Sequence, residues 1–296
     1  MDDIYSMLNK ENPKANDTNK RMSKEEYAKM MSENRKRLYD MSDVQVKKIA
    51  NDPSMYLDYL EMLANTDYTV FNTLLVMAQN PEATMLKDAS HWRETGNYVN
   101  KGEKGIQIME PKGEYTKRDG STGVNYAIKY VFDVSQVNGD VEPHQNMRTG
   151  DILHALTYGG IPVKQSDMKS NYSVYYSSED KTIYYCKNLT RDELLNGFIR
   201  ETCYGEFEKQ YGKINRNRDG FIVESSAYIL CSKLGVENNG QSIANESVTY
   251  FSGMDAKEMK HNLTEIKTLA DDVNKQMERA LYKRQQKDKK KNQEVR

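Results

Sequence analysis

The first part of the chain contains three segments whose apolar residues recur at helical spacing. Ser23 followed by Glu26 has the spacing of a capping box, which predicts a helix over about residues 24–40. Two more apolar segments lie between Pro53 and Pro81, and the prolines mark the start of one helix and the end of the other. The pattern predicts a helical cluster at the front of the chain.

The pattern changes after Pro81. Short apolar segments alternate with glycines over residues 92–108, and residues 125–134 have the apolar and β-branched composition of a strand. This part of the chain is predicted to form a small antiparallel sheet with hairpins.

The second half returns to helical spacing, interrupted by two short strand signals. Thr190 and Glu193 repeat the capping-box spacing ahead of an apolar helix. The other expected elements are helices over about 148–158, 222–234 and 255–283, and strands near 172–176 and 182–186.

These elements predict an α+β protein of two domains, each combining helices with a small sheet. A length of 296 residues agrees with two domains of about 150 residues. The expected parts are a disordered N-terminus (1–20), a first domain (21–140), a linker without periodicity (141–147), a second domain (148–282) and a basic tail (283–296).

Composition and charge exclude several classes of protein. The formal net charge is -1, so any attraction to nucleic acid must be local; the tail holds seven basic and two acidic residues. The four histidines are too far apart for a two-histidine metal site on one helix, and the three cysteines form no CxxC motif. The absence of a signal peptide and of a long apolar run predicts a cytoplasmic protein without a membrane partner.

The most informative segment is 92–108, WRETGNYVNKGEKGIQI, in which aromatic and basic residues alternate on a glycine-rich backbone. Binding of single-stranded DNA needs rings on which bases stack and cations that follow the phosphates. The alternative is that the rings belong to the core, the glycines form hairpin turns and the lysines keep a sheet edge soluble. The candidate DNA-binding residues are Trp92, Arg93, Tyr98, Lys101, Lys104, Lys129 and Tyr130.

Three segments in the same order give the chain a resemblance to a known family. They are 68–72 (YTVFN), 92–108 and 131–136 (VFDVSQ), and they are similar to the N-terminal domain of ArdC-like antirestriction proteins, including LtrC-like proteins of mobile elements. That domain binds single-stranded DNA in the family, so the resemblance favours DNA contact by the aromatic and basic residues of 92–108.

The second half resembles the C-terminal part of the same family, which looks like a zincin metallopeptidase with an HExxH motif. The matching segment is Arg200-Glu201-Thr202-Cys203-Tyr204, so both zinc-binding histidine positions are changed and the general-base glutamate is kept. Glu224 matches the position of the third ligand.

The changed residues cannot hold zinc, because arginine stays protonated and a neutral phenol is a poor ligand. We expect no bound metal or other cofactor and no catalytic residue. Arg200 is instead predicted to pair with Glu224, or else with Glu201; the alternative is that Arg200 and Glu201 face solvent on an amphipathic helix.

The resemblance implies a single-stranded DNA-binding antirestriction protein of a conjugative element, with an inactive metallopeptidase-like second domain. Two other functions are compatible with the sequence. One is a module that binds a host restriction or regulatory protein, and the other is a divergent metallopeptidase that uses Glu201 as base and Glu224 as a metal ligand.

Overall fold

A computed structural model describes residues 23–139, 141, 147–158, 160–166 and 172–294. The expected disorder of 1–20 and most of the linker 141–147 fall outside these residues. Internal contacts divide the chain into a unit that ends at Tyr39 and a unit that begins at Asp40.

The helices at the front of the chain begin where the sequence predicts. Helix α2 (Lys24–Asn51) starts with the expected capping box: the Ser23 hydroxyl accepts from the Glu26 amide (3.1 Å), and the Glu26 carboxylate accepts from the Ser23 amide (2.9 Å). The helix runs past the expected end near residue 40 because no glycine or proline interrupts it before Pro53.

Two shorter helices follow, each capped by a side chain that accepts from the first turn. Asp52 caps α3 (Pro53–Thr66), in which Pro53 occupies the first turn, where a missing amide hydrogen costs nothing. Thr69 caps α4 (Val70–Gln79), which ends before Pro81 as predicted.

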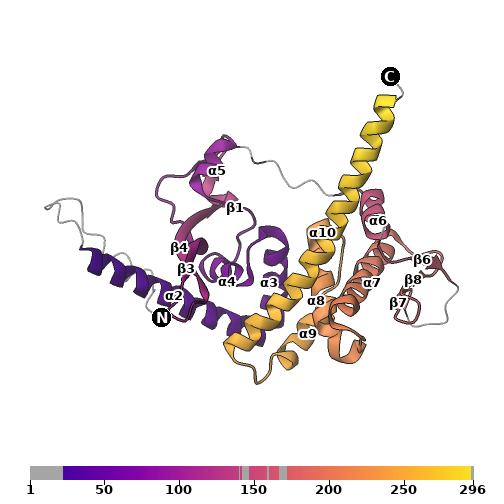
Figure 1. The fold of residues 1–296 in the computed structure, drawn as a ribbon, viewed down its shortest axis with the longest axis horizontal. Coiled ribbons are helices and arrows are strands. Elements are labelled where there is room, and N and C mark those ends of the chain that lie inside the picture. The colour runs from indigo at the N-terminus through magenta and orange to yellow at the C-terminus, as the bar shows by residue number, and fades with distance from the viewer. Residues whose placement is uncertain (1–22, 140, 142–146, 159, 167–171, 295–296) are drawn as a thin grey trace. The chain divides into compact units, whose positions relative to one another are not determined.

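The expected antiparallel sheet contains three strands, in the order β1-β4-β3. Strands β3 (Ile106–Thr116) and β4 (Thr122–Asp133) form the long hairpin in Figure 1, and β1 (Leu86–Lys87) pairs with the end of β4. Four short elements accompany this sheet. They are helix α5 (Ala89–Glu94), the 3-10 turn η1 (Val134–Gln136), and strands β2 (Tyr98–Val99) and β5 (Val137–Asn138), which pair with each other.

Two amide side chains of α4 close the outer edge of β3. The Asn72 side chain accepts from the backbone amide of Met109 (3.0 Å) and donates to its carbonyl (2.9 Å). Gln79, two turns later, makes the same pair of bonds with Gln107, both at 2.9 Å. Because edge groups must find partners, these four hydrogen bonds fix the position of the hairpin on α4.

Within its described residues, the second half contains a small mixed sheet and five helices. Strand β8 (Thr182–Tyr185) lies between the parallel strand β6 (Val163–Gln165) and the antiparallel strand β7 (Val174–Ser177). The helices are α6 (Thr149–Thr157), α7 (Arg191–Tyr211), α8 (Arg216–Leu234), α9 (Gln241–Tyr250) and α10 (Ala256–Glu294); the sequence pattern did not predict β6, α5 or α9.

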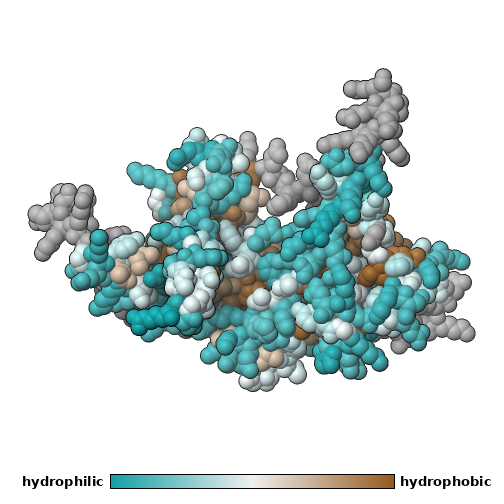
Figure 2. All heavy atoms as spheres, in the orientation of Figure 1, coloured by the Kyte–Doolittle hydropathy of each residue, from teal (hydrophilic) through white to brown (hydrophobic). Residues whose placement is uncertain are grey.

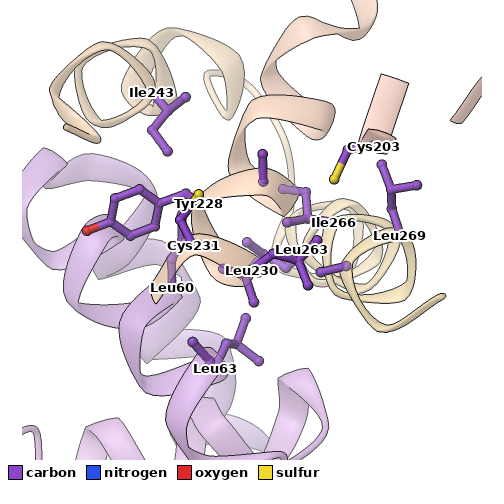
Figure 3. Close-up of a cluster of buried hydrophobic side chains, with 14 of the residues drawn as sticks. Leu60, Leu63, Cys203, Tyr228, Leu230, Cys231, Ile243, Leu263, Ile266 and Leu269 are labelled. Atoms are coloured by element: carbon purple, nitrogen blue, oxygen red, sulfur yellow. The ribbon is translucent and has the colours of Figure 1, made fainter. Parts of the chain in front are cut away.

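The hydrophobic core runs through both halves of the second unit. Side chains of α3, α8, α9 and α10 converge in the cluster of Figure 3. Tyr56 of α3 stacks on Phe221 of α8 (ring centroids 5.5 Å apart) and donates to the buried Ser225 hydroxyl (2.8 Å). The helices and small sheets together confirm the predicted α+β class. The boundaries of the two domains stay a prediction.

Helix α10 is longer than predicted and continues through most of the basic tail. The sequence pattern places its end near residue 283, and the helix extends to Glu294. In Figure 2 hydrophilic side chains line the viewed face of α10. Among the described residues, none of the helices combines the length and apolar character needed to span a bilayer.

Two glycines let α7 pack closely against β7 and against the segment that precedes β6. A Cβ atom on Gly197 would lie 2.5 Å from Val174 Cγ2, and one on Gly205 would lie 2.1 Å from Ile161 Cδ1. These positions are eight residues apart, with Glu201 midway between them, so all three lie near one face of the helix. The glycines therefore bring Glu201 against β7.

We predict that Gly197→Ala lowers the free energy of unfolding by about 1–3 kcal/mol, because the added methyl group overpacks the contact with Val174. Urea unfolding followed by circular dichroism measures the change. Gly150→Ala, also in a helix but with nothing within 4 Å of the new Cβ, serves as the control and should not be destabilised. Equal stability of both variants would contradict the close approach.

Candidate functional site

Trp92 lies in the core of the segment that the sequence marks for DNA binding. Its side chain is 0% exposed, and its indole N–H donates to the Phe132 carbonyl (2.9 Å). The Lys87 ammonium lies 4.7 Å from the ring centroid. No face of the ring is open to a base, so the structure corrects the expectation that Trp92 stacks on DNA and supports the core alternative for this residue.

Tyr98 and Tyr130 are exposed, at 56% and 54%. Strand β2 carries Tyr98, whose amide donates to the Asn138 side chain (3.1 Å). Tyr130 lies on β4, and its hydroxyl accepts from the Gln107 side chain (3.0 Å). A Cβ on Gly105 would lie 2.9 Å from Tyr130 Cβ, so the glycine leaves room for the tyrosine.

The two neighbouring residues of β4, Lys129 and Tyr130, point to opposite faces of the sheet, as strand alternation requires. The Lys129 ammonium lies 2.7 Å from Glu110 and 3.9 Å from Asp88, and the hydrogen bond to Glu110 raises the pKa of Lys129. Lys129 thus neutralises protein carboxylates on the other face. The structure does not bring it together with Tyr130 as one surface.

Arg93, Lys101 and Lys104 are all exposed, at the end of α5 and in the loop between β2 and β3. The Gln136 side chain donates to the Lys104 carbonyl and to the Glu103 carboxylate, both at 2.9 Å. These bonds anchor the backbone that carries Lys104 while its side chain extends from the surface.

Asp133 links the chain segments next to the exposed residues Arg93, Lys101 and Lys104 by hydrogen bonds. Its buried carboxylate accepts from the amides of Thr84, Met85 and Ser135 and from the Ser135 hydroxyl, at 2.6–3.1 Å. Burial raises the pKa of Asp133, but these hydrogen bonds outweigh burial and hold it below the ordinary value. The Asp133 amide donates to Gln136 (3.0 Å), which completes the link to Lys104.

The second candidate site is a charged cluster around Glu201, which is 0% exposed. Arg200 donates to Glu201 Oε1 (2.9 Å), and Arg216 donates to both carboxylate oxygens, at 3.2 and 2.6 Å. Although burial lowers the pKa of Arg216, its bonds to Glu201 raise it overall. The alternative, in which Glu201 faces solvent, is wrong.

Arg200 lies within ion-pairing distance of both expected carboxylates. Its Nε is 2.9 Å from Glu201 Oε1 and 3.9 Å from Glu224 Oε1, so the first-ranked partner, Glu224, is the more distant. The Tyr204 hydroxyl donates to Glu224 Oε1 (3.3 Å). Burial raises the pKa of Glu224, and burial with the nearby Glu224 charge raises that of Tyr204.

The charged cluster also closes the outer edge of β7. The Cys186 amide donates to the Ser173 carbonyl (2.9 Å) at the end of the β7–β8 ladder, and the alternation of the ladder leaves the backbone groups of Val174 and Tyr176 on the outer side. The Tyr176 amide donates to Glu201 (2.8 Å). Arg200 donates to the Val174 carbonyl (3.2 Å) and Arg216 to that of Tyr176 (3.3 Å). Side chains therefore replace a neighbouring strand.

These residues do not fit a metal ion. Two guanidinium groups and a phenol surround Glu201; arginine offers no lone pair, and both Glu201 oxygens already accept hydrogen bonds. In the described part of the chain, no three His, Cys, Asp or Glu side chains come together as a metal site. The arrangement can hold backbone and charge in place, and Glu201 is closed off from solvent within it.

A cavity of about 580 Å³ lies beside Arg200. Its lining includes four carboxylate side chains and a single guanidinium, that of Arg200. The carboxylates belong to Asp192, Glu193, Glu224 and Glu237. Such a lining repels phosphate, so this cavity is a poor place for nucleic acid.

The sequence pattern did not indicate the residues that hold the edge of β3 and the charged cluster around Glu201 in place. Asn72 stands in one of the segments that carry the resemblance, but neither its spacing nor that of Gln79 indicates a bond to a strand edge. Arg216 begins α8 and lies 15 positions from Glu201. Each contact depends on the packing of an α-helix against a particular strand, which no local pattern encodes.

No protein-family model and no curated protein matches the sequence. Two crystal structures of the antirestriction protein ArdC from the R388 plasmid are similar to this chain at 16% identity. The metal-free one covers 72% of this chain and 86% of its own, with a TM-score of 0.47. The Mn(II)-bound one covers 71% and 85%, with a TM-score of 0.49. Such values do not transfer ArdC's function to this chain.

We predict that Glu201→Gln lowers the free energy of unfolding by about 3–5 kcal/mol, because it leaves two partly buried guanidinium groups without their counter-charge. Urea unfolding measures the loss. Hydrogen exchange should show faster exchange of the Tyr176 amide, which donates to Glu201.

Glu237→Gln is the matched control, since Glu237 is exposed. A surface change of this kind is expected to stay within about 0.5 kcal/mol. If Glu201→Gln were equally mild, the charged cluster would not stabilise the fold.

Proposed function

We propose that this chain binds single-stranded DNA without reading its sequence, and that it is an antirestriction-type protein of a mobile genetic element. The DNA surface is formed by Tyr98 and Tyr130 together with Arg93, Lys101 and Lys104. The biological role, protection of incoming DNA in the recipient cytoplasm, follows the resemblance of the segments 68–72, 92–108 and 131–136 to ArdC-like proteins.

The observation that carries the proposal is the exposure of two rings and of three cations from neighbouring segments, with part of their backbone anchored. Tyr98 and Tyr130 each present more than half of their surface to solvent. Hydrogen bonds to Gln107 and Gln136 hold Tyr130 and the Lys104 backbone. Stacking on rings and charge along the phosphates are the two components of sequence-independent single-strand binding.

Binding of this kind covers a strand and requires no turnover. Each base has a flat face, so tyrosine rings accept any sequence. The arginine and lysines neutralise phosphates and release counterions, which makes the affinity depend on salt. A covered strand is then sterically protected from other proteins while it remains single-stranded.

We infer that the second half is a scaffold without hydrolytic activity. Glu201, at the general-base position of the resembled motif, accepts hydrogen bonds from Arg200, Arg216 and the Tyr176 amide. A base must be able to take a proton from water within hydrogen-bond reach. The burial and hydrogen bonds of Glu201 support a structural role for it and not the role of a general base.

Fluorescence anisotropy with a labelled single strand and its duplex, over a range of salt concentrations, tests DNA binding. We predict preference for the single strand and a slope of log affinity against log salt of about -2, from three cations at about 0.7 each. Tyr98→Ala and Tyr130→Ala should each weaken binding by about 1–3 kcal/mol, the usual worth of one base–aromatic stack.

Tyr211→Ala is the control for these variants, because Tyr211 is 52% exposed but lies at the end of α7. It should leave the affinity unchanged. Absence of binding even at low salt would overturn the proposal and favour a host protein as partner. A pull-down from nuclease-treated recipient extract would then identify that protein.

Metal analysis of the purified chain tests the scaffold inference. We predict less than stoichiometric zinc, because Arg200 and Tyr204 stand at the two histidine positions and Arg216 adds a second positive charge beside Glu201. Stoichiometric zinc that survives dialysis would contradict this inference and favour a divergent metallopeptidase.

A further inference from the structure

One face of β4 carries three large side chains in a row, Tyr126, Ile128 and Tyr130. They occupy alternate positions of a strand without a bulge of its own, so all three point to the same face. Tyr126 is 39% exposed and Tyr130 54%. Their cross-strand neighbours on β3 are Pro111, Met109 and Gln107, in that order.

The spacing of this row differs from that of stacked bases. Residues rise about 3.4 Å along an antiparallel strand, so side chains two apart on one face are separated by about 6.8 Å. Successive bases in B-DNA rise about 3.4 Å. Neighbouring bases can lie on neighbouring side chains of the row only if they are unstacked, which a single strand permits and an intact duplex does not.

The rings at the two ends of the row are set on an ordered hairpin. The Tyr130 hydroxyl accepts from Gln107, whose backbone is in turn bonded to Gln79 of α4. A ring held before binding loses little side-chain entropy when a base stacks on it. The Tyr130 end of the row is therefore held in place before a base arrives.

Charge distinguishes the two faces of the hairpin. Lys129, Glu110 and Asp88 lie on the opposite face, where two carboxylates face one ammonium. The face of Tyr130 instead borders Gly105, which directly follows the exposed Lys104. Phosphates are therefore favoured on the side of the tyrosine row.

We propose that Tyr126, Ile128 and Tyr130 form a stacking row that binds three successive bases of an extended single strand. This inference rests on the proposed single-strand binding and extends it. It adds Tyr126 as a DNA-contacting residue, explains rejection of the duplex by base spacing, and directs the strand along β4 toward the hairpin tip.

The test compares Tyr126 variants with a matched variant on the other face. Tyr115 lies on the same hairpin and is 45% exposed. It pairs with Gly123, which points to the face of β4 opposite Tyr126, so Tyr115 lies on that opposite face. The probe is a labelled oligothymidylate of about 16 nucleotides, the upper end of common site sizes. Anisotropy gives the dissociation constant, and thermal unfolding verifies that each variant is folded.

Tyr126→Ala and Tyr126→Leu should weaken binding about 5- to 150-fold, the equivalent of one base–aromatic stack. Tyr126→Phe keeps the ring and should bind as the wild type does. Tyr115→Ala should stay within about twofold of the wild type. The leucine variant keeps the test valid if alanine unfolds the hairpin.

Two results would overturn the stacking row and leave the proposed function standing. One is wild-type affinity in the Tyr126→Leu variant, and the other is an equal loss in the Tyr126 and Tyr115 variants. A wild-type chain that does not bind the oligothymidylate at low salt would instead overturn both proposals.

Discussion

The unpaired edge of a β-strand is the constraint around which both candidate sites are built. Backbone N–H and C=O groups at an edge need partners or water. Here side chains of a neighbouring helix supply them: Asn72 and Gln79 for β3, and the charged cluster of Arg200, Glu201 and Arg216 for β7. Each small sheet is thereby fixed on its helix. The positions of the exposed tyrosines and of the cavity beside Arg200 follow from these anchors.

Similar bonds explain why several polar and aromatic residues in the segments 68–72, 92–108 and 131–136 are buried or half-buried. Asn72 holds a strand edge, Trp92 fills the core, and Asp133 and Gln136 tie three loops together. Each of these residues is polar or aromatic, the types usually associated with a binding surface. In this chain they are interior supports, and the surface they position consists of Tyr98, Tyr130 and the nearby cations.

Local patterns were sufficient for most of the helices and for the long hairpin. Capping boxes at Ser23 and Thr190 mark helix starts that the structure confirms, because capping is decided within a few residues. The opposite orientation of Lys129 and Tyr130 follows from strand alternation. The burial of Trp92 and the bond from Arg216 to Glu201 were not predictable in this way. They depend on packing and on pairing between segments far apart in the chain.

The charged cluster also makes this part of the fold difficult to convert into a metal site. Replacing Arg200 and Tyr204 by histidine would still leave Arg216 bonded to Glu201 and to the edge of β7. Removing Arg216 as well would expose backbone groups that have no other partner in the described structure. Each such substitution therefore passes through a less stable protein. The arginines that stabilise this part of the fold also keep histidine substitutions at these positions from creating a metal site.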